Sequence, residues 1–368
     1  MILGPKGLKN HKGIGMSRLF VFIALLGLLG ACAPRQIAGL SKPVAEAKVE
    51  RIFVATQRTL SETRSLFGAK RPRKMNYRVV DVSVPTTHKL GQIEWGRGEA
   101  DPKRHFAAVD LEVFEDVKQF RSAIRSEPSG PLNVTNVYVH GFNTTVDEAV
   151  FRLAQIRHDF IDPSPAVVFA WPSAARLGAY AYDRDSVLFA RDDLVKLLRD
   201  LTKETEANVR ITAHSMGAQL AMEALRHIAI SGDRRLLSRV SGVVLVAPDI
   251  DPDVFRRQAE AIGDLPEEFY IFAAQQDRAL RLSALLTGKE RVGVIQGTKD
   301  VEGLDVTVID FSQLTDGKHL DHQVGLTSPG AIRVLNGLLD NNPNGLLETS
   351  SKRLEGTKHT EFFSLGPT

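Results

Sequence analysis

Short apolar segments alternate along the chain with longer segments in which apolar residues recur every three or four positions. The short segments are rich in strand-forming residues and predict β-strands at residues 77–84, 106–114, 134–139, 166–170, 209–212, 243–246, 269–273 and 306–309. The longer segments predict helices, and Thr145 and Glu148 have the spacing of a capping box at the start of one. This alternation favours an α/β fold with a mostly parallel central sheet and helices on both faces.

Motifs rich in polar and small residues follow four of these strands, after residues 139, 212, 246 and 274. The carboxyl ends of parallel strands meet at one edge of a sheet, and open α/β sheets place their functional groups there. The sequence therefore predicts one site built from several strand ends.

The most informative motif is Ala213-His214-Ser215-Met216-Gly217. A serine between a strand and a helix, with small residues two positions away on either side, is typical of a nucleophile elbow. Ala213 takes the place of the first glycine of the usual pattern. The helix that follows points its positive end at the serine, which favours the oxyanion formed by attack on a carbonyl.

Two backbone N–H groups are expected to bind that oxyanion. One belongs to Met216, directly after the serine, and the other to Phe142, in the loop after residue 139. His140-Gly141 is similar to the H-G element of esterases and lipases, in which glycine lets the backbone approach the substrate.

A serine nucleophile needs a base, and the base needs an orienting carboxylate. In α/β hydrolases the chain order is serine, acid, histidine. Asp277 follows the second strand after the elbow and is the favoured acid, with Asp249 as the alternative. His322 is the favoured base and His319 the alternative, because both lie after the last predicted strand.

The remaining histidines near these motifs have another expected role. His140 and His214 lie beside reactive motifs, and we expect them to shape the site and not to act as its base.

Taken together, the motifs resemble those of a bacterial α/β-hydrolase family of largely undefined function. The motif residues are Arg51-Ile52-Phe53-Val54-Ala55-Thr56, Val139-His140-Gly141-Phe142-Asn143-Thr144, Phe169-Ala170-Trp171-Pro172-Ser173, Ala213 to Gly217, Ala247-Pro248-Asp249-Ile250-Asp251 and Asp277-Arg278-Ala279-Leu280. The resemblance covers residues 50 to 340. It implies the α/β-hydrolase fold and a triad of Ser215, Asp277 and His322, with Asn143 and Trp171 among the residues that shape the site.

The chain departs from the family pattern at two places. Ala218 follows the elbow glycine where asparagine is expected, and no aromatic residue follows the histidine of the base segment. Both departures concern the shape of the pocket more than the triad.

The N-terminal residues are typical of a targeting segment. Basic residues precede an apolar stretch at 19–29, which is too short to span a bilayer. Small residues then lead to Cys32, the single cysteine, in a pattern that resembles a bacterial lipobox. We expect residues 1–32 to be a signal peptide with lipid attached at Cys32, 33–49 to be a tether, 50–340 to be the hydrolase domain, and 341–368 to be a disordered tail.

Composition restricts the class of protein. Hydrophobic residues make up 43% and charged residues 25% of the chain, as in a soluble globular protein. The net charge of +3 is small and does not indicate nucleic-acid binding. No His, Asp and Glu cluster has the spacing of a metal site.

The motifs favour a cofactor-independent serine hydrolase that cleaves small-molecule or lipid esters in the cell envelope. Two alternatives remain open. One is a catalytically silent, membrane-tethered scaffold protein, and the other is an acyltransferase that uses the same triad.

Overall fold

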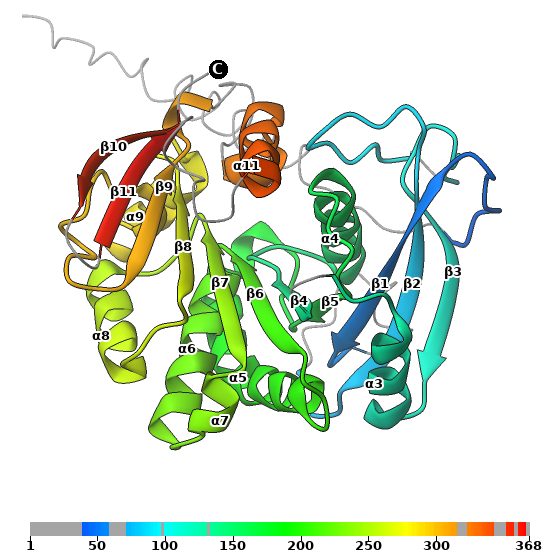
Figure 1. Cartoon of the computed structure of the whole chain (residues 1–368), viewed down its shortest axis with the longest axis horizontal. Helices are drawn as coiled ribbons and strands as arrows, with labels where there is room; N and C mark the ends of the chain where they lie inside the picture. Colours follow the sequence, from blue (N-terminus) through cyan, green and yellow to red (C-terminus); the bar gives the residue numbers. More distant parts are fainter. Residues whose placement is uncertain are drawn as a thin grey trace, which may run out of the picture. The chain divides into compact units, whose positions relative to one another are not determined.

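Eleven strands of the described chain form one sheet in the order β10-β11-β9-β8-β7-β6-β4-β5-β1-β2-β3. The computed structural model describes residues 39–58, 71–96, 99–130, 133–314, 322–341, 351–356 and 360–365. These residues all lie in one unit, which begins at Gln36. In Figure 1 the blue and cyan strands β1–β3 form one end of the sheet and the orange and red strands β9–β11 form the other.

The strands are β1 (Lys48–Thr56), β2 (Asn76–Val84), β3 (Ala107–Phe114), β4 (Val134–Val139), β5 (Ala166–Ala170), β6 (Asn208–His214), β7 (Val240–Val246), β8 (Glu268–Ala273), β9 (Val306–Asp310), β10 (Ser351–Gly356) and β11 (Thr360–Leu365). The eight central strands, which in sheet order are β11, β9, β8, β7, β6, β4, β5 and β1, are parallel to one another. At the two ends of the sheet, β10 pairs antiparallel with β11, and β2 pairs antiparallel with β1 and β3. The predicted mostly parallel sheet is confirmed.

The helices are α3 (Val117–Ser126), α4 (Val146–Asp159), α5 (Tyr180–Thr202), α6 (Met216–Ile230), α7 (Arg234–Leu237), α8 (Pro252–Ile262), α9 (Arg278–Thr287), α10 (Val324–Thr327) and α11 (Pro329–Asn341), with single 3₁₀ turns η1 (Leu177–Ala179), η2 (Val292–Val294) and η3 (Ser312–Leu314). The predicted capping box begins α4, because Thr145 and Glu148 each accept a hydrogen bond from the other's backbone N–H.

Alternate strand residues point to opposite faces of the sheet, and helices cover both faces. Val137 and Val139 of β4 pack in one apolar cluster with α5, α6 and α8, whereas Tyr138 packs in a second cluster with α4. A third cluster joins Phe272 of β8 to α10 and α11. These contacts hold the loops at the carboxyl ends of the strands in place.

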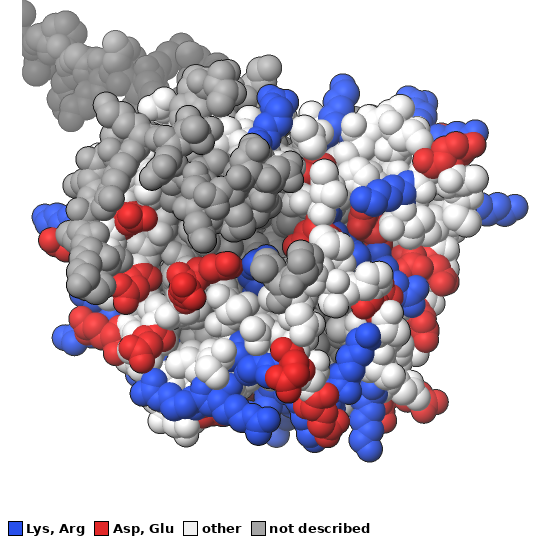
Figure 2. Space-filling model, in the orientation of Figure 1, with Lys and Arg blue, Asp and Glu red and all other residues white. Residues whose placement is uncertain are grey.

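Acidic and basic side chains are mixed on one face of the molecule (Figure 2). Both signs occur across the described part of the face drawn in Figure 2, and neither forms a continuous field there. Among the described residues, no helix combines the length and the apolar character needed to cross a bilayer.

The C-terminal region differs from the sequence prediction, which assigned residues 341–368 to a disordered tail. β11 pairs with β9 in parallel, and Phe362 and Leu365 are 1% and 0% exposed. The prediction is therefore wrong for β10 and β11. A polar stretch of sequence separates the short apolar segment of β11 from the rest of the domain. Only the folded structure shows that β11 pairs with the edge of β9, which would otherwise be exposed.

The strand β1 was not among the predicted strands, although part of it was recognised as a motif. It pairs in parallel with β5 and antiparallel with β2. The predicted tether also begins to contact the domain earlier than expected, because Ser41 bonds through its N–H to Ala108 and through its hydroxyl to Ala100. Cys32 and the predicted signal peptide lie outside the described residues.

Candidate active site

Ser215 occupies a strained turn between β6 and α6. Its φ of 55° and ψ of −120° are rare for a residue with a side chain. The turn is held on both sides, since the Ser215 N–H donates to Val246 O at 2.9 Å and the Asp249 N–H donates to Ser215 O at 3.2 Å. The serine side chain therefore has a fixed position at the carboxyl edge of the sheet, with the N-terminus of α6 directly behind it.

Two glycines permit this turn because neighbouring atoms lie too close for a side chain. A Cβ atom at Gly217 would lie 2.3 Å from His140 O, so only glycine lets α6 start against the end of β4. A Cβ atom at Gly141 would lie 2.7 Å from His214 Nδ1 and 3.0 Å from Ser215 Cβ. The loop after β4 is thus packed directly against the serine.

Asp277 and His322 form a hydrogen-bonded pair. His322 Nδ1 lies 2.7 Å from Asp277 Oδ2, and the carboxylate is 0% exposed. The other carboxylate oxygen, Oδ1, accepts the Leu280 N–H at 2.9 Å and so caps α9. Because both oxygens of Asp277 accept hydrogen bonds, Nδ1 of His322 carries a proton and Nε2 is left available as a base.

His214 connects the serine turn to the His322 segment. Its Nε2 lies 3.2 Å from His322 O, and its Nδ1 lies 3.2 Å from Nε2 of the Gln323 side-chain amide. A carbonyl oxygen can only accept and an amide nitrogen can only donate, so His214 is the neutral tautomer with its proton on Nε2. Burial, and next the nearby His322, lower the pKa of His214 well below its ordinary value, in agreement with this neutral state.

Within the described ranges, Ser215 Oγ forms no hydrogen bond, and none is present between it and His322. The base and the serine are brought to the same edge by the His214 contacts, without a direct bond. Catalytic hydrogen bonds are often long in enzymes that hold no substrate. The alternative base His319 lies outside the described residues.

The two expected oxyanion donors lie on the two sides of the serine. In the described part of the chain, neither the Met216 N–H nor the Phe142 N–H donates to another protein group. Met216 begins α6, whose first N–H groups have no partner inside the helix. The ring of Phe142 packs edge-on against Tyr180, with ring centroids 5.5 Å apart.

His140 is a packing residue behind this loop. Its ring stacks on Trp171 with centroids 5.0 Å apart, and Trp171 Nε1 donates to His140 O at 2.7 Å. Burial is the main cause that lowers the pKa of His140 to about 4, so the ring is neutral at physiological pH. The pair fixes the end of β4 beside the end of β5.

Among the described residues, the alternative acid Asp249 contacts no histidine, and it belongs to a separate buried network. Its Oδ1 accepts from Ser283 Oγ at 2.6 Å and lies 3.1 Å from Arg291 Nε, and its Oδ2 accepts from Tyr180 Oη at 2.9 Å. Burial, and next the charge of Asp249, raise the pKa of Tyr180 to about 12. Tyr180, Ser283 and Arg291 were not found by sequence reasoning, because their pattern in the chain is that of ordinary helix and loop residues.

Asp183, on α5, is a further residue that the motifs did not indicate. It is fully buried and accepts hydrogen bonds from Ser173 Oγ at 2.5 Å, the Ala174 N–H at 2.7 Å and the Asn143 N–H at 3.4 Å. Burial raises its pKa. The carboxylate thus joins the loop after β4, which includes Asn143 in a left-handed conformation with φ of 55°, to the loop after β5.

The helix α10, which begins two residues after His322, is held in place by contacts with α4. Gln155 Nε2 donates to Leu326 O at 3.1 Å and to Asp159 Oδ2 at 2.6 Å. Gly91 also approaches this helix so closely that a Cβ atom there would lie 1.9 Å from Thr327 O. The Gly91 N–H donates to Asp159 Oδ2 at 2.7 Å, so one carboxylate holds both supports of α10.

A histidine bound by two carboxylates completes this brace. His88 Nε2 lies 2.8 Å from Asp159 Oδ1, and its Nδ1 lies 2.9 Å from Glu94 Oε2. Burial acts to lower the pKa of His88, but the hydrogen bonds to Asp159 and Glu94 outweigh it and raise the pKa. The protonated ring can donate to both carboxylates at once.

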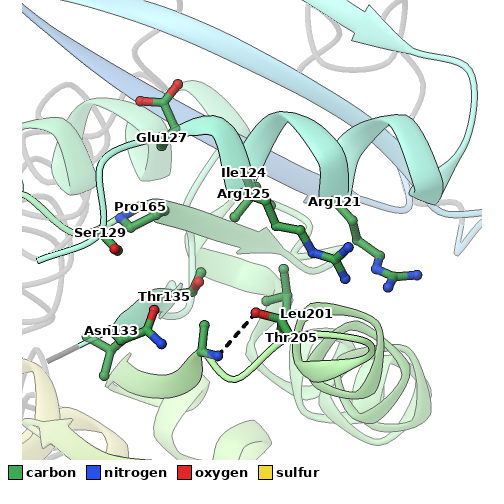
Figure 3. Close-up of a pocket in the computed structure, with 12 residues that line it drawn as sticks. Arg121, Ile124, Arg125, Glu127, Ser129, Asn133, Thr135, Pro165, Leu201 and Thr205 are labelled. Carbon is green, nitrogen blue, oxygen red and sulfur yellow. Dashed lines mark hydrogen bonds between the residues drawn. The ribbon is translucent and has the colours of Figure 1, made fainter.

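The pocket drawn in Figure 3 lies away from these residues. Its volume is about 240 Å³, and its lining includes Asn133 before β4, Pro165 before β5 and Ala207 before β6. It is therefore at the amino ends of the strands, opposite the site. Arg121 and Arg125 of α3 line it, and both guanidinium groups bond to Lys203 O.

In the described part of the chain, no group of three or more His, Cys, Asp and Glu side chains is placed to hold a metal ion.

Solved structures of esterases are similar to this chain at low identity. Esterase B from Lactobacillus rhamnosis is 13% identical, with 90% of this chain and 96% of that chain covered and a TM-score of 0.34. The carboxylesterase EstE1, cloned from a metagenomic library, is 12% identical, with 80% and 76% covered and a TM-score of 0.26. A Trichoderma reesei cutinase is 14% identical, with 36% of this chain and 63% of the cutinase covered and a TM-score of 0.24, so less than two thirds of the cutinase is matched.

None of the curated proteins matches the chain in sequence. Residues 114–338 match the model of a family whose description is "Alpha/beta hydrolase of unknown function (DUF900)". The matched segment runs from the end of β3 into α11 and includes Ser215, Asp277 and His322. It covers more than half of the chain and confirms both the predicted fold and the predicted kind of family. The chain belongs to the DUF900 family of α/β hydrolases of unknown function.

Proposed function

We propose that this protein is a serine hydrolase that cleaves carboxylic esters through an acyl-enzyme intermediate. Ser215 is the nucleophile, His322 the general base and Asp277 the carboxylate that orients the base. The observation that carries the proposal is the 2.7 Å contact between His322 Nδ1 and the buried Asp277, beside a serine held in a strained strand-to-helix turn.

The proposed reaction uses these positions. His322 Nε2 accepts the hydroxyl proton while Ser215 Oγ forms a bond to the carbonyl carbon, and the oxyanion is held by the Met216 and Phe142 N–H groups. His322 then gives the proton to the leaving alcohol as the carbon–oxygen bond of the ester breaks. Water then gives a proton to the same nitrogen as its oxygen attacks the acyl carbon. His322 returns this proton to Ser215 Oγ as the acyl–oxygen bond breaks, which releases the carboxylic acid and restores Ser215.

The contacts of the other histidines support this division of roles. His140 and His214 are both held neutral by burial, and each ring is occupied by packing or hydrogen bonds. Asp249 is paired with Arg291, so Asp277 is the acid that faces a histidine.

Labelling by a fluorophosphonate probe tests the proposal. The full chain is expected to be labelled, and Ser215→Ala is expected to abolish labelling and hydrolysis of a soluble aryl ester. Ser231→Ala, at the opposite end of α6, is the matched control and should be labelled like the unaltered chain. A folded protein that is not labelled, or that is labelled equally in Ser215→Ala, would falsify the proposal and favour a silent scaffold protein.

Acyl transfer is distinguished in the same assay. If added alcohols divert the acyl group to new esters in preference to water, the acyl-enzyme serves a transferase. If the carboxylic acid remains the product, the enzyme is a hydrolase.

We also propose that the chain is anchored in the cell envelope by lipid at Cys32. The support is the basic residues, the apolar stretch and the small residues that precede this cysteine. Metabolic labelling with an alkynyl fatty acid should tag the full chain but not Cys32→Ser.

A further inference from the structure

The helix α9 turns leucine side chains outward at the catalytic edge of the sheet. Leu282, Leu285 and Leu286 are 59%, 82% and 65% exposed. Their spacing of three and four residues places them on one side of the helix. Single exposed apolar residues are normal, but a contiguous group of them marks a surface that contacts something.

The opposite side of α9 is fastened to the candidate active site. Leu280 is 1% exposed, and Ser283 Oγ donates to Asp249 Oδ1 at 2.6 Å. The helix also begins at Asp277, whose side chain caps it and contacts His322. These contacts prevent the helix from turning its leucines inward, so the outward direction of the three side chains is built into the fold.

The charges on α9 indicate what the leucines contact. Arg278 and Arg281 are exposed on the same side of the helix, and α9 contains no acidic residue. An apolar stripe with flanking arginines suits a surface of anionic phospholipids, where leucines enter the acyl region and arginines meet the headgroups.

A neighbouring loop presents a similar pair of residues. Arg176 is exposed, and Leu177 at the start of η1 is 49% exposed. Tyr180 ties this loop to α9, because its hydroxyl lies 2.9 Å from Ser283 Oγ. Two adjoining elements at the carboxyl edge therefore present leucine and arginine together.

We propose that α9 and η1 form a docking surface for an anionic phospholipid bilayer. Leu282, Leu285 and Leu286 insert among the lipids, and Leu177 adds a further leucine on the neighbouring loop. Docking would leave only the helix α9 between the bilayer and the pair of Asp277 and His322. Access of lipid esters to the active site is an advantage that rests on the proposed function. The docking itself does not depend on catalysis.

A second copy of the chain fits this surface less well. A stable interface buries about 800 Å² on each partner, more than three leucines supply. In a two-fold dimer the same patch meets itself, so Arg278 and Arg281 of each copy would face the like charges of the other.

Tryptophan fluorescence tests the insertion in the full chain. Leu285→Trp is mixed with vesicles of phosphatidylcholine and phosphatidylglycerol, with or without brominated acyl chains. We expect a blue shift and, with brominated lipids, about a twofold loss of the emission that this substitution adds to that of the native Trp95 and Trp171, and little change with phosphatidylcholine alone. Ile230→Trp, at the far end of α6 with an exposure of 58%, is the matched control and should not respond.

The predicted N-terminal anchor is present in both variants, so only a difference between them reports on α9. Emission from Leu285→Trp that is unaffected by brominated lipids, while the protein sediments with the vesicles, overturns the proposal. Self-association without lipid that Leu285→Ser abolishes would also overturn it, in favour of a dimer. Fluorophosphonate labelling in solution, without vesicles, tests the proposed function independently of membrane docking.

Discussion

The ring of His214 lies edge-on against the ring of His322, with ring centroids 4.6 Å apart. His214 is the residue before the strained serine, and its Nε2–H donates to the backbone carbonyl of His322. The segment that carries the proposed base is therefore attached to the end of the strand that carries the proposed nucleophile. We therefore infer that His214 is a positioning residue for the proposed reaction.

Replacement of His214 by phenylalanine should lower kcat and leave KM nearly unchanged. The ring is kept, but the donor to His322 O is lost. A net hydrogen bond of about 1 kcal/mol corresponds to roughly a fivefold slower reaction. Steady-state hydrolysis of a soluble aryl ester measures this, with His227→Phe on α6 as the control. An unchanged kcat would show that the contact does not position the base.

Asp277→Asn should reduce kcat by about four orders of magnitude, as loss of the orienting carboxylate does in serine proteases. The free energy of unfolding should change little, because an asparagine oxygen can still accept the Leu280 N–H and cap α9. Asp251→Asn is the matched control, since Asp251 caps α8 in the same way and has no bond to any histidine within the described ranges. Equal activity of both variants would exclude Asp277 as the acid.

Asp249→Asn should instead reduce stability. Arg291 is 3% exposed, and removal of the opposing charge leaves it buried without compensation. Breaking a buried ion pair costs about 3–5 kcal/mol, which urea denaturation would detect. The folded fraction should still react with a fluorophosphonate. Loss of labelling without loss of stability would instead identify Asp249 as the catalytic acid.

Gly217→Ala should destabilise the protein by about 1–3 kcal/mol or more, because the new methyl group overlaps the backbone carbonyls at the end of β4. Gly178→Ala is the control, as no atom lies within 4 Å of a Cβ atom at that position. Thermal unfolding of the two variants measures the difference. Equal melting temperatures would contradict the close approach of α6 to β4.

The His88 brace should make stability depend on pH. The pKa of His88 is raised in the folded state, so its contribution is fully present below the unfolded pKa and is lost as pH rises through the folded pKa. The pKa of Asp159 is lowered: burial alone would raise it, but hydrogen bonds from His88, Gly91 and Gln155 outweigh burial. The Asp159 contribution is present above its unfolded pKa and lost as pH falls through the folded pKa.

Urea denaturation over a pH series measures this dependence. The loss of stability on the alkaline side should be smaller in His88→Gln, which cannot be protonated. His105→Gln is the control, and its profile should follow that of the unaltered chain. The prediction fails if His88→Gln and the unaltered chain lose the same stability on the alkaline side.

Much of the fold follows from local pattern. The strands predicted at 134–139 and 166–170 coincide with β4 and β5, because buried parallel strands are continuous apolar runs with clear ends. β11 was missed because its six residues have no periodic neighbour, and only the exposed edge of β9 gives them a place to pair. Asp183 was missed because a buried carboxylate within a helix has no local signature.

The sequence by itself determined the α/β class, the family and the elbow at Ser215, because strand-to-helix turns and their small residues are local and depend on steric limits within a few positions. Only the tertiary structure placed Asp277 against His322, Asp249 against Arg291 and the leucines of α9 toward solvent. Hydrogen-bond partners and exposure depend on which distant segments meet at the sheet edge. The order of residues along the chain limits which segments can lie together at that edge, but it does not specify which of them do.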